Sequence, residues 1–184
     1  MKLELKDIYK YLPFGLNCGL MGEHDEETEQ PILFELYSLC SDNVIVLEGK
    51  DELNCQYEDL FPILRPMSDL IKPITVDGGT FVPIEGLIKI AFSKETEHFE
   101  IEKKYGCSSS AIAAEWTFSI KSKYRFVYSF GLFFCYIGNN LNPYGETEIP
   151  FYNQELLFDF LYSLHFDVNG LIEKGLAIDI NTLK

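Results

Sequence analysis

The stretch YRFVYSFGLFFCYIG, residues 124–138, decides the fold, because its side chains follow a β pattern. Bulky residues occupy its even positions from Tyr124 to Tyr136, and a period of two with rings on one face indicates a strand. Gly131 allows a bulge, a bend or a break into two strands. We therefore expect a central strand whose even-numbered rings are buried against a helix near the C-terminus.

Two other interpretations of this stretch are weaker. A membrane-spanning helix needs about 20 apolar residues, whereas this run is shorter and contains Arg125. A platform for stacked bases also places aromatic side chains on a strand, but it needs cations around it. The chain has 29 Asp and Glu residues against 15 Lys and Arg, a formal net charge of −14. This balance disfavours direct nucleic-acid binding and an anionic membrane surface, so burial in a sheet is preferred.

Length and composition indicate one folded domain. A single hydrophobic core serves chains of up to about 250 residues, and this chain has 184. Hydrophobic residues make up 47% and charged residues 24%, which is typical of globular proteins. Aromatic residues make up 15%, and their rings bury large areas. We expect a single domain spanning residues 1–184.

Turn signals and periodicity predict the other elements. A hairpin is expected where SDN, residues 41–43, joins two β-prone runs, and a second where DGG, residues 77–79, supplies positive φ angles. Residues 3–12 are expected to form an amphipathic helix that ends before Pro13. The side of this helix that should be buried carries Leu5, Ile8 and Leu12. The other expected elements are a strand at 14–21, a short helix from about Ser68, a strand at 97–102, a loop or helical turn at 106–114, and a helix at 153–166.

The order of these elements sets the fold class. Strands dominate the body and helices lie near the ends, without the regular β-α-β alternation of a doubly wound parallel sheet. The predicted fold is therefore α+β. It consists of a mainly antiparallel, aromatic-rich sheet packed by a C-terminal helix and short terminal helices. In the C-terminal helix, Asn153 is the expected N-cap, and Leu157, Phe160, Leu161 and Leu164 form the expected buried face.

Cysteine usage indicates a reducing compartment. The five cysteines form no C-x-x-C pair, and an odd number cannot all pair within one chain. The first residues, MKLELKDIYKYLPFG, contain no continuous apolar run, so no export signal is expected. Free thiols and a cytoplasmic location are predicted. The cysteines are Cys18, Cys40, Cys55, Cys107 and Cys135.

One candidate site lies on the strand expected at residues 97–102. His98, Glu100 and Glu102 share one face of that strand, and an imidazole with two carboxylates could bind a metal or share a proton. His24 and His165 lie far away in sequence, and no spacing completes the site. A solvated strand face is therefore the stronger interpretation.

Two further candidates have structural interpretations that are at least as strong. Cys107 follows a glycine among small residues, the most accessible context of the five thiols, and could pair with a histidine in space. The acidic loop EHDEETE, residues 23–29, contains His24 but lacks the glycine and closing glutamate of a calcium loop. A structural thiol and a solvated loop are preferred.

Common catalytic and phosphate-binding motifs are missing from the sequence. Gly15, Gly19 and Gly22 are misspaced for a dinucleotide fingerprint, and LEGKDE has Asp51 where a phosphate loop needs a hydroxyl. G-x-S-x-G and H-E-x-x-H do not occur. We assign no catalytic, cofactor-binding or metal-binding residue and expect no cofactor.

Three stretches together resemble small uncharacterised proteins encoded by Bacteroidetes phages and prophages. They are LKDIYKYLPFGL near the start, PILRPMSDL at residues 62–70, and HFDVNGLIEKGLAIDINTL at the end. In those proteins similar ends bracket a variable middle. The resemblance implies a mobile-element origin and a host-cytoplasmic setting, and it carries no activity. By analogy, such an arrangement suits a scaffold whose central surface meets changing partners.

Three hypotheses about function follow, in order of preference. The first is a non-enzymatic interaction protein of phage or prophage origin, whose partner is a host or phage protein. The second is an acidic, host-directed inhibitor that mimics nucleic acid, because the net charge is −14. The third is a small enzyme or metal binder that uses His98, Glu100 and Glu102, or Cys107. We expect no membrane association, and the oligomeric state is left open.

Overall fold

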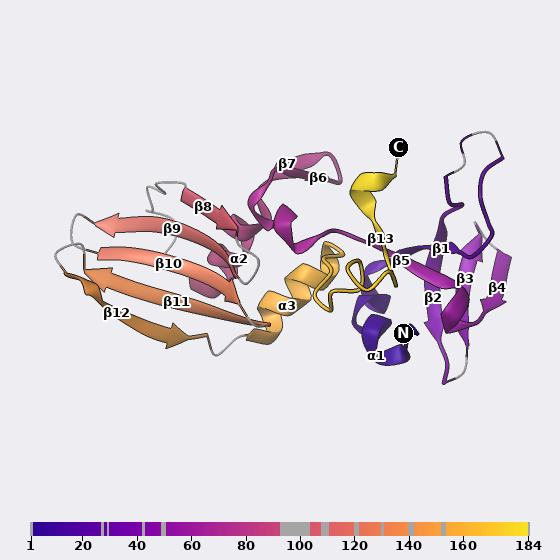
Figure 1. Ribbon diagram of the computed structural model, residues 1–184, viewed down its shortest axis with the longest axis horizontal. Coiled ribbons are helices and arrows are strands. Elements are labelled where there is room, and N and C mark those ends of the chain that lie inside the picture. Colours follow the sequence, from indigo (N-terminus) through magenta and orange to yellow (C-terminus); the bar gives the residue numbers. More distant parts are fainter. Residues whose placement is uncertain are drawn as a thin grey trace. The chain divides into compact units, whose positions relative to one another are not determined.

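The computed structural model has an α+β fold (Figure 1) with mainly antiparallel sheets, which confirms the predicted fold class. Contacts group the chain into two compact units. Unit 1 comprises Met1–Pro66 and Leu161–Lys184, and unit 2 comprises Met67–Phe160. The expectation of one domain over residues 1–184 stays a prediction. The structure describes residues 2–26, 28, 30–41, 43–48, 51–92, 104–107, 111–119, 122–129, 131–139, 142–151 and 154–183.

Unit 1 begins with helix α1, Leu5–Ile8, which continues as the 3₁₀ helix η1, Tyr9–Phe14. Glu4 and Asp7 form a capping box at the start of α1. The predicted helix is confirmed, but its buried side is wrong in part, because Leu5 is 42% exposed whereas Ile8 and Tyr11 are buried. A 3₁₀ helix has about three residues per turn, so positions three apart share a face once η1 begins. Pro13 lies inside η1 rather than after it.

A six-stranded sheet forms the rest of unit 1. Its strand order is β13-β5-β1-β2-β3-β4, and every pair is antiparallel except β13 with β5. The predicted hairpin around residues 41–43 is confirmed as β2 and β3, and the strand predicted at 14–21 as β1. Strand β5 was not predicted, because Pro62 and Pro66 indicated a break there. The strands are β1 (Asn17–Leu20), β2 (Phe34–Leu39), β3 (Val44–Glu48), β4 (Asp51–Cys55), β5 (Leu60–Leu64) and β13 (Ile178–Asp179).

Most of the core of unit 1 lies on one face of this sheet, where the inward side chains alternate along the strands, as the period of two requires. The end of β5 is buried on both faces, because the consecutive Ile63 and Leu64 are both buried. Short 3₁₀ helices complete the unit at η2, Tyr57–Asp59, and η5, Ile180–Thr182. The buried apolar side chains of the sheet include Cys18, Phe34, Leu36, Val44, Val46, Leu60, Ile63 and Leu64.

Unit 2 opens with the 3₁₀ helix η3, Met67–Ile71, where a short helix was predicted. Strands β6 (Ile74–Val76) and β7 (Gly79–Phe81) then form the second predicted hairpin. Its central residues Asp77 and Gly78 have φ values of 50° and 77°, which a tight turn with two left-handed residues requires. The hairpin prediction is confirmed.

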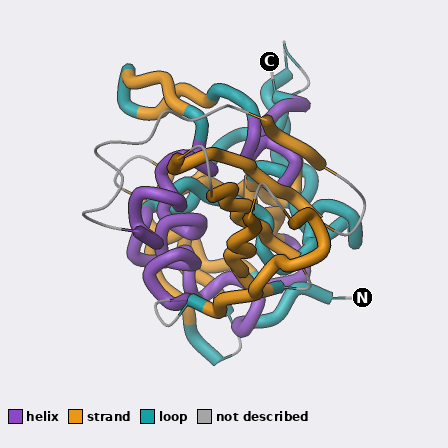
Figure 2. Tube along the Cα trace, turned by 90° about the vertical axis from the view of Figure 1, so that its left-hand side faces the viewer, coloured by secondary structure: helices purple, strands orange, loops and turns teal. Residues whose placement is uncertain are grey.

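Helix α2, Pro83–Phe92, was not predicted, although the sequence carries its signals. Proline is favoured at the first helical position, and Glu85 lies in the first turn, where a carboxylate opposes the helix dipole. Ile84, Leu87 and Ile88 are buried and recur at helical spacing. The helix lies behind the five-stranded sheet of unit 2 in Figure 1 and along one side of its strands in Figure 2.

The five-stranded sheet of unit 2 has the order β12-β11-β10-β9-β8, and all its pairs are antiparallel. The loop or helical turn predicted at residues 106–114 is wrong, because β8 and β9 occupy its two ends. The strand predicted at 97–102 lies outside the described residues. The strands are β8 (Lys104–Cys107), β9 (Ala111–Ser119), β10 (Ser122–Ser129), β11 (Leu132–Asn139) and β12 (Asn142–Pro150).

The stretch 124–138 forms two strands, which is the break at Gly131 that the sequence allowed, rather than one central strand. Strand β10 pairs with β11 across a turn in which Gly131 has a φ of 73°. The register joins Phe126 to Cys135 and Tyr128 to Phe133, and directly opposite residues share a face. The face that carries Phe126, Phe133 and Cys135 is therefore even-numbered in β10 and odd-numbered in β11, and Val127 is buried on the other face. Leu132, expected to be buried, is 46% exposed.

Aromatic rings nevertheless fill the core of unit 2, as predicted. The ring centroid of Phe133 lies 5.5 Å from that of Phe126 and 4.9 Å from that of Tyr128. Helix α3, Gln154–Ser163, adds Phe158, whose ring centroid lies 5.3 Å from that of Phe133. Gln154 extends the contact, because its amide bonds both the N–H and the carbonyl oxygen of Phe133, at 3.0 and 2.6 Å. Packing of this stretch against the C-terminal helix is confirmed for Tyr128, whose ring centroid lies 6.5 Å from that of Phe158. Phe133, at an odd position, was not expected to face the helix.

Candidate functional site

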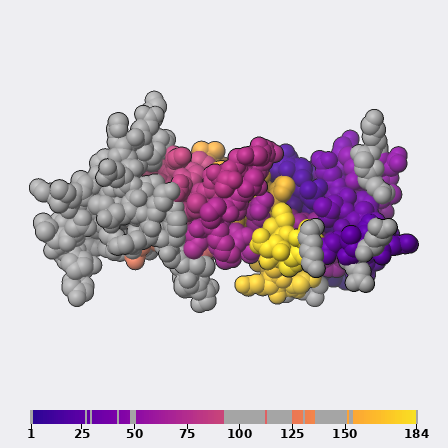
Figure 3. Space-filling model, turned by 90° about the horizontal axis from the view of Figure 1, so that it is seen from above, coloured from indigo at the N-terminus to yellow at the C-terminus, as the bar shows by residue number. Residues whose placement is uncertain are grey.

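Hydrogen bonds join the start of the chain to its end within unit 1. The hydroxyl of Tyr11, which is fully buried, donates to the carbonyl oxygen of Phe166 at 2.7 Å. Asn169 Nδ2 donates to the carbonyl oxygen of Asp7 at 2.9 Å. His165 Nε2 lies 3.0 Å from the carbonyl oxygen of Phe14. We call these residues, together with Arg65 and Asp167, the terminal junction. Figure 3 shows the C-terminal segment, in yellow, at the molecular surface.

The backbone of Arg65 links the end of β5 to the same C-terminal segment. Its N–H donates to the carbonyl oxygen of His165 at 2.7 Å, and its carbonyl oxygen accepts from the N–H of Asp167 at 2.8 Å. Farther along, Ile178 pairs with Ile63 in the parallel strand pair β13–β5. The segments LKDIYKYLPFGL, PILRPMSDL and HFDVNGLIEKGLAIDINTL therefore contribute to one hydrogen-bonded cluster.

His165 ends helix α3 with a left-handed residue. Its φ is 57°, its N–H donates to the carbonyl oxygen of Tyr162, and the N–H of Phe166 donates to that of Leu161. These two bonds define a Schellman motif, in which glycine is the usual left-handed residue. The histidine ring reaches the carbonyl oxygen of Phe14, a bond that glycine could not make.

The protonation state of His165 follows from its surroundings. Burial lowers the pKa of the imidazole, the nearby Arg65 lowers it further, and the bond to the Phe14 carbonyl raises it. A carbonyl oxygen can only accept, so the neutral ring carries its proton on Nε2. In this state the imidazole links the segment that follows helix α3 to the end of η1.

Asp167 is a buried carboxyl group with a structural role. Its two oxygens accept the N–H groups of Leu171 and Ile172, at 2.7 and 2.8 Å. Burial raises the pKa of Asp167, while the two backbone bonds and Lys174 lower it. Both carboxyl oxygens of Asp167 therefore stabilise the turn that leads to Leu171 and Ile172.

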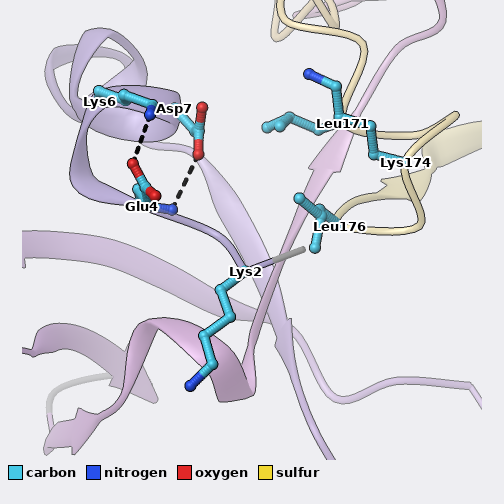
Figure 4. Close-up of a pocket in the computed structure, with 7 residues that line it drawn as sticks. All are labelled: Lys2, Glu4, Lys6, Asp7, Leu171, Lys174 and Leu176. Atoms are coloured by element: carbon cyan, nitrogen blue, oxygen red, sulfur yellow. Dashed lines mark hydrogen bonds and ion pairs between the residues drawn. The ribbon is translucent and has the colours of Figure 1, made fainter.

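A pocket of about 160 Å³ opens beside the terminal junction (Figure 4). Lys6 pairs with Glu4 at 2.6 Å, and Lys174 Nζ donates to the carbonyl oxygen of Asn169 at 2.6 Å. Lys2 points away from the other six residues and pairs with Glu58. Exposed ion pairs of this kind contribute little to stability. The lining consists of Lys2, Glu4, Lys6, Asp7, Leu171, Lys174 and Leu176.

The chemistry of this lining is limited. Its charges are of both signs and engage one another, the backbone or, for Lys2, Glu58 outside the lining. None of the seven lining residues has an imidazole, thiol or hydroxyl group, so the lining offers no nucleophile of these kinds and no histidine base. The pocket therefore supports no reaction that we can derive.

A different surface of unit 1 exposes apolar side chains. Register places Leu47 of β3 between Glu35 of β2 and Glu52 of β4. The next row places Ile45 between Ser38 and Asn54. Both glutamates and Asn54 are exposed, while the two apolar side chains and Ser38 are half-buried. We call this surface, with Tyr37 and Leu33, the outer face.

A β-bulge in β2 shapes the outer face. The register shifts between Leu36 and Ser38, so Tyr37 is the extra residue of the bulge. Tyr37 is 55% exposed, and Leu33, just before β2, is 49% exposed. The bulge leaves Tyr37 and Ser38 on the same side of the sheet and returns the strand to register with Val44. Bulges of this kind re-aim side chains and are common next to functional sites.

The structure tests few of the candidate residues from the sequence. His98, Glu100 and Glu102 lie outside the described residues, and Cys107 is described only as backbone at the end of β8. The metal and enzyme hypotheses built on them stay predictions. Where the chain is described, no three His, Cys, Asp or Glu residues are grouped as metal ligands would be.

The acidic loop at residues 23–29 is a solvated loop over its described part. Residues 23–26 are exposed. Asp25 accepts the N–H and the hydroxyl of Thr28, at 2.9 and 2.8 Å, which closes a local turn. His24 forms an isolated β-bridge with Pro31. Glu27 and Glu29 lie outside the described residues.

None of the described thiols forms a disulfide, in agreement with the sequence analysis. The described cysteines are Cys18, Cys40, Cys55 and Cys135. Burial raises the pKa of Cys18 and Cys55, and it raises the pKa of Cys135 to about 12. Because the thiolate is the nucleophilic form, these three groups are inert at neutral pH.

Sequence reasoning missed the terminal junction and the outer face. Tyr11 and Arg65 carry no motif, and their partners lie far away in the chain. Asp167 carries none either, although its carboxyl group bonds the nearby Leu171 and Ile172. The alternation of β2 did point to Tyr37 as an outward residue, but the bulge that accompanies it has no sequence signal.

Comparison with protein-family models, with curated proteins and with solved structures finds no match to this chain. None of the helices in the described parts of the chain has the length and apolar character needed to cross a membrane.

Proposed function

We propose that the chain is a non-enzymatic interaction protein of phage or prophage origin, which acts in the host cytoplasm by binding a host or phage protein. The observation that carries this proposal is the exposure of large apolar side chains on the outer face. Tyr37 and Leu33 expose about half of their surfaces beside the half-buried Ile45 and Leu47. Contiguous exposed apolar patches are a mark of protein–protein contact.

The chemistry of these side chains fits such a role. Tyrosine is enriched among the residues that dominate binding energy, because its ring buries a large area and its hydroxyl finds a partner. Tyr37 lies on a strand, and side chains on strands are held more firmly than those on loops. The outer face therefore presents an anchor residue in a fixed position.

The hydrogen bonds of the terminal junction also support the proposal, because they stabilise unit 1. Its polar groups bond one another: Tyr11 bonds Phe166, His165 bonds Phe14, and Asp167 bonds two backbone N–H groups. Groups engaged in this way brace unit 1. A braced unit that also carries an exposed apolar face suits a scaffold that binds partners.

A co-purification experiment tests the proposal. Tagged protein is expressed in infected or lysogenic host cells, crosslinked and purified, and the recovered partner is then made separately and mixed with the pure chain. We expect a stable complex of defined stoichiometry in size-exclusion chromatography with light scattering. Substrate turnover by the isolated chain, with no partner that reconstitutes, would contradict the proposal.

A matched pair of variants sharpens this experiment. Tyr37→Ser combined with Leu33→Ser removes the exposed anchors of the outer face. Leu156→Ser removes an apolar side chain on α3 that is 56% exposed and lies in unit 2. We expect the first variant to lose the complex and the second to keep it.

Charge distribution favours a second candidate, the acidic inhibitor that mimics nucleic acid. Unit 1 contains seventeen acidic and seven basic residues, a net charge of −10, whereas unit 2 contains twelve and eight, a net charge of −4. Concentrated negative charge attracts surfaces that bind phosphates. If this candidate is right, the chain should displace duplex DNA from a basic DNA-binding protein of the host in a mobility-shift assay. Failure to compete at low salt would remove it.

A further inference from the structure

We propose that the outer face of β2–β4 is a docking surface for a basic segment of a partner protein, in which Lys or Arg side chains are interleaved with apolar ones. This inference rests on the proposed function and specifies the chemistry of the partner. It depends on the order of apolar and acidic side chains across three adjacent strands.

The apolar part of the surface is continuous across two rows. Leu47 and Ile45 lie two positions apart on β3, so their side chains point to the same side of the sheet. Tyr37 is the bulge residue beside the row of Ile45. An apolar side chain from a partner would bury Leu47, Ile45 and Tyr37 together, which provides the hydrophobic part of the binding energy.

The acidic part of the surface flanks this apolar centre. Glu35 and Glu52 lie directly on either side of Leu47 in the register, and both are exposed. Adjacent strands are about 4.8 Å apart, so the two glutamates are separated by about 10 Å. The remaining members of the two rows, Ser38 and Asn54, are neutral. Cations on either side of an apolar residue in a partner would meet one carboxylate each.

Packing covers part of the sheet next to β2. At β1, a Cβ added to Gly19 would lie 3.2 Å from Pro31 and 3.3 Å from Ile178, so these two side chains cover the strand at Gly19. Asn17 of β1, which lies opposite Glu35, is exposed and uncharged. The docking surface therefore ends at Gly19 on its β1 side, and its row through Glu35 continues to a neutral residue.

Electrostatics exclude two other occupants. Nucleic acid presents phosphates, which Glu35 and Glu52 would repel in a unit of net charge −10. A second copy of the chain docked face to face would place the same carboxylates opposite each other, and like charges at an interface are costly. A cationic and apolar segment is the chemistry that remains complementary.

A designed peptide tests the surface directly. The probe is a short synthetic peptide in which arginine and valine alternate at every second position with serine between them, so that an extended peptide presents both to one side. It is added to the ¹⁵N-labelled full-length chain and followed by amide chemical shifts. We expect the shifts to concentrate on β2–β4 and the affinity to fall as salt rises. Two control peptides, one alternating glutamate with valine and the other arginine with serine, should bind at least about tenfold more weakly.

Charge-reversal variants provide a matched control for net charge. Glu35→Lys with Glu52→Lys changes the outer face, while Glu23→Lys with Glu26→Lys makes the same net change on the exposed acidic loop. We expect the first variant to lose about tenfold or more in affinity and the second less than about threefold. Unchanged far-UV circular dichroism and melting temperature confirm that both variants fold.

Each contrary result has a definite meaning. Shifts centred outside β2–β4, equal losses in the two charge-reversal variants, or tight binding of the arginine–serine peptide would overturn the docking surface. If a reconstituted partner keeps its affinity for the Glu35→Lys, Glu52→Lys variant, the docking surface is wrong while the proposed function stands. If no partner reconstitutes and the chain turns over a substrate, the proposed function itself fails.

Discussion

His165 Nε2 lies 3.0 Å from the carbonyl oxygen of Phe14, a residue 151 positions earlier in the chain. This bond occurs at a residue with a φ of 57°, where glycine would be less strained. Histidine at this position therefore adds backbone strain and forms a long-range hydrogen bond. The net effect on the free energy of unfolding can be measured.

Replacement of His165 by glycine should destabilise the protein by about 1–2 kcal/mol. Relief of left-handed strain contributes about 1 kcal/mol in favour of glycine, but the Phe14 carbonyl loses its partner and the unfolded chain gains entropy. Urea denaturation measures the difference. Asp77→Gly is the control, because Asp77 also has a positive φ of 50° but lies in an exposed turn. Its effect should lie within about 0.5 kcal/mol of zero. A stabilising His165→Gly would show that the ring bond is negligible.

Protonation of His165 should lower stability in mildly acidic solution. Burial holds the folded-state pKa below the ordinary value of 6.5, so the unfolded state binds the proton more readily. The contribution of the neutral ring is complete above pH 6.5 and is lost as the pH falls from there toward the lowered folded-state pKa. Asp167 has the opposite effect at lower pH. Because its folded-state pKa is raised above the ordinary value of 3.8, its contribution to the free energy of unfolding declines as the pH rises above 3.8.

The measurement is the free energy of unfolding as a function of pH for the wild type and for His165→Asn. Asparagine tolerates the left-handed conformation but does not titrate. We expect the two curves to converge as the pH falls below 6.5. Parallel curves through this range would show that the imidazole does not titrate differently on folding.

Replacement of Gly86 by alanine should destabilise unit 2. A Cβ at this position of α2 would lie 2.6 Å from the ring tip of Phe160, so the helix or the ring must move. Overpacking costs about 1–3 kcal/mol, against a gain of about 1 kcal/mol in helix propensity. Thermal unfolding of Gly86→Ala with and without Phe160→Leu checks this, because the smaller side chain should recover stability. If Gly86→Ala alone raises the melting temperature, the close approach is not present.

The register of β10 and β11 predicts a large difference between neighbouring residues. Phe133→Ala removes a fully buried ring and should cost about 3–5 kcal/mol. Leu132→Ala changes a side chain that is 46% exposed and should cost less than about 1 kcal/mol. Denaturant unfolding of the two variants measures both losses of stability. In a single strand with even-numbered residues inside, Leu132→Ala would be more destabilising than Phe133→Ala, the reverse of what the observed hairpin predicts.

Local patterns in the sequence predicted much of the secondary structure. The SDN and DGG turns each joined strands as expected, because positive φ angles and short-range hydrogen bonds depend on neighbouring residues. Helix α3 also followed from its periodicity. Helix α2 had comparable signals, with Pro83 at its start and Ile84, Leu87 and Ile88 on one side, and it could have been predicted.

The candidate site was much less accessible to sequence reasoning. Glu35, Leu47 and Glu52 form a row only because three strands align in one register, and a shift of one residue would turn each side chain to the other face. Tyr37 owes its place beside Ile45 to a bulge. Neither feature is encoded by residue type at a fixed spacing.

The amino-acid sequence by itself determined that the chain is acidic, rich in aromatic residues and of the α+β class, since charge, composition and short-range periodicity are properties of local segments. Tertiary structure alone decided which face of residues 124–138 is buried, because the turn at Gly131 changes the parity of the inward positions. It also brought Tyr11, Arg65 and Asp167 into one cluster with the end of the chain. Hydrogen bonds between distant residues form only once the chain is compact, so no short stretch records them.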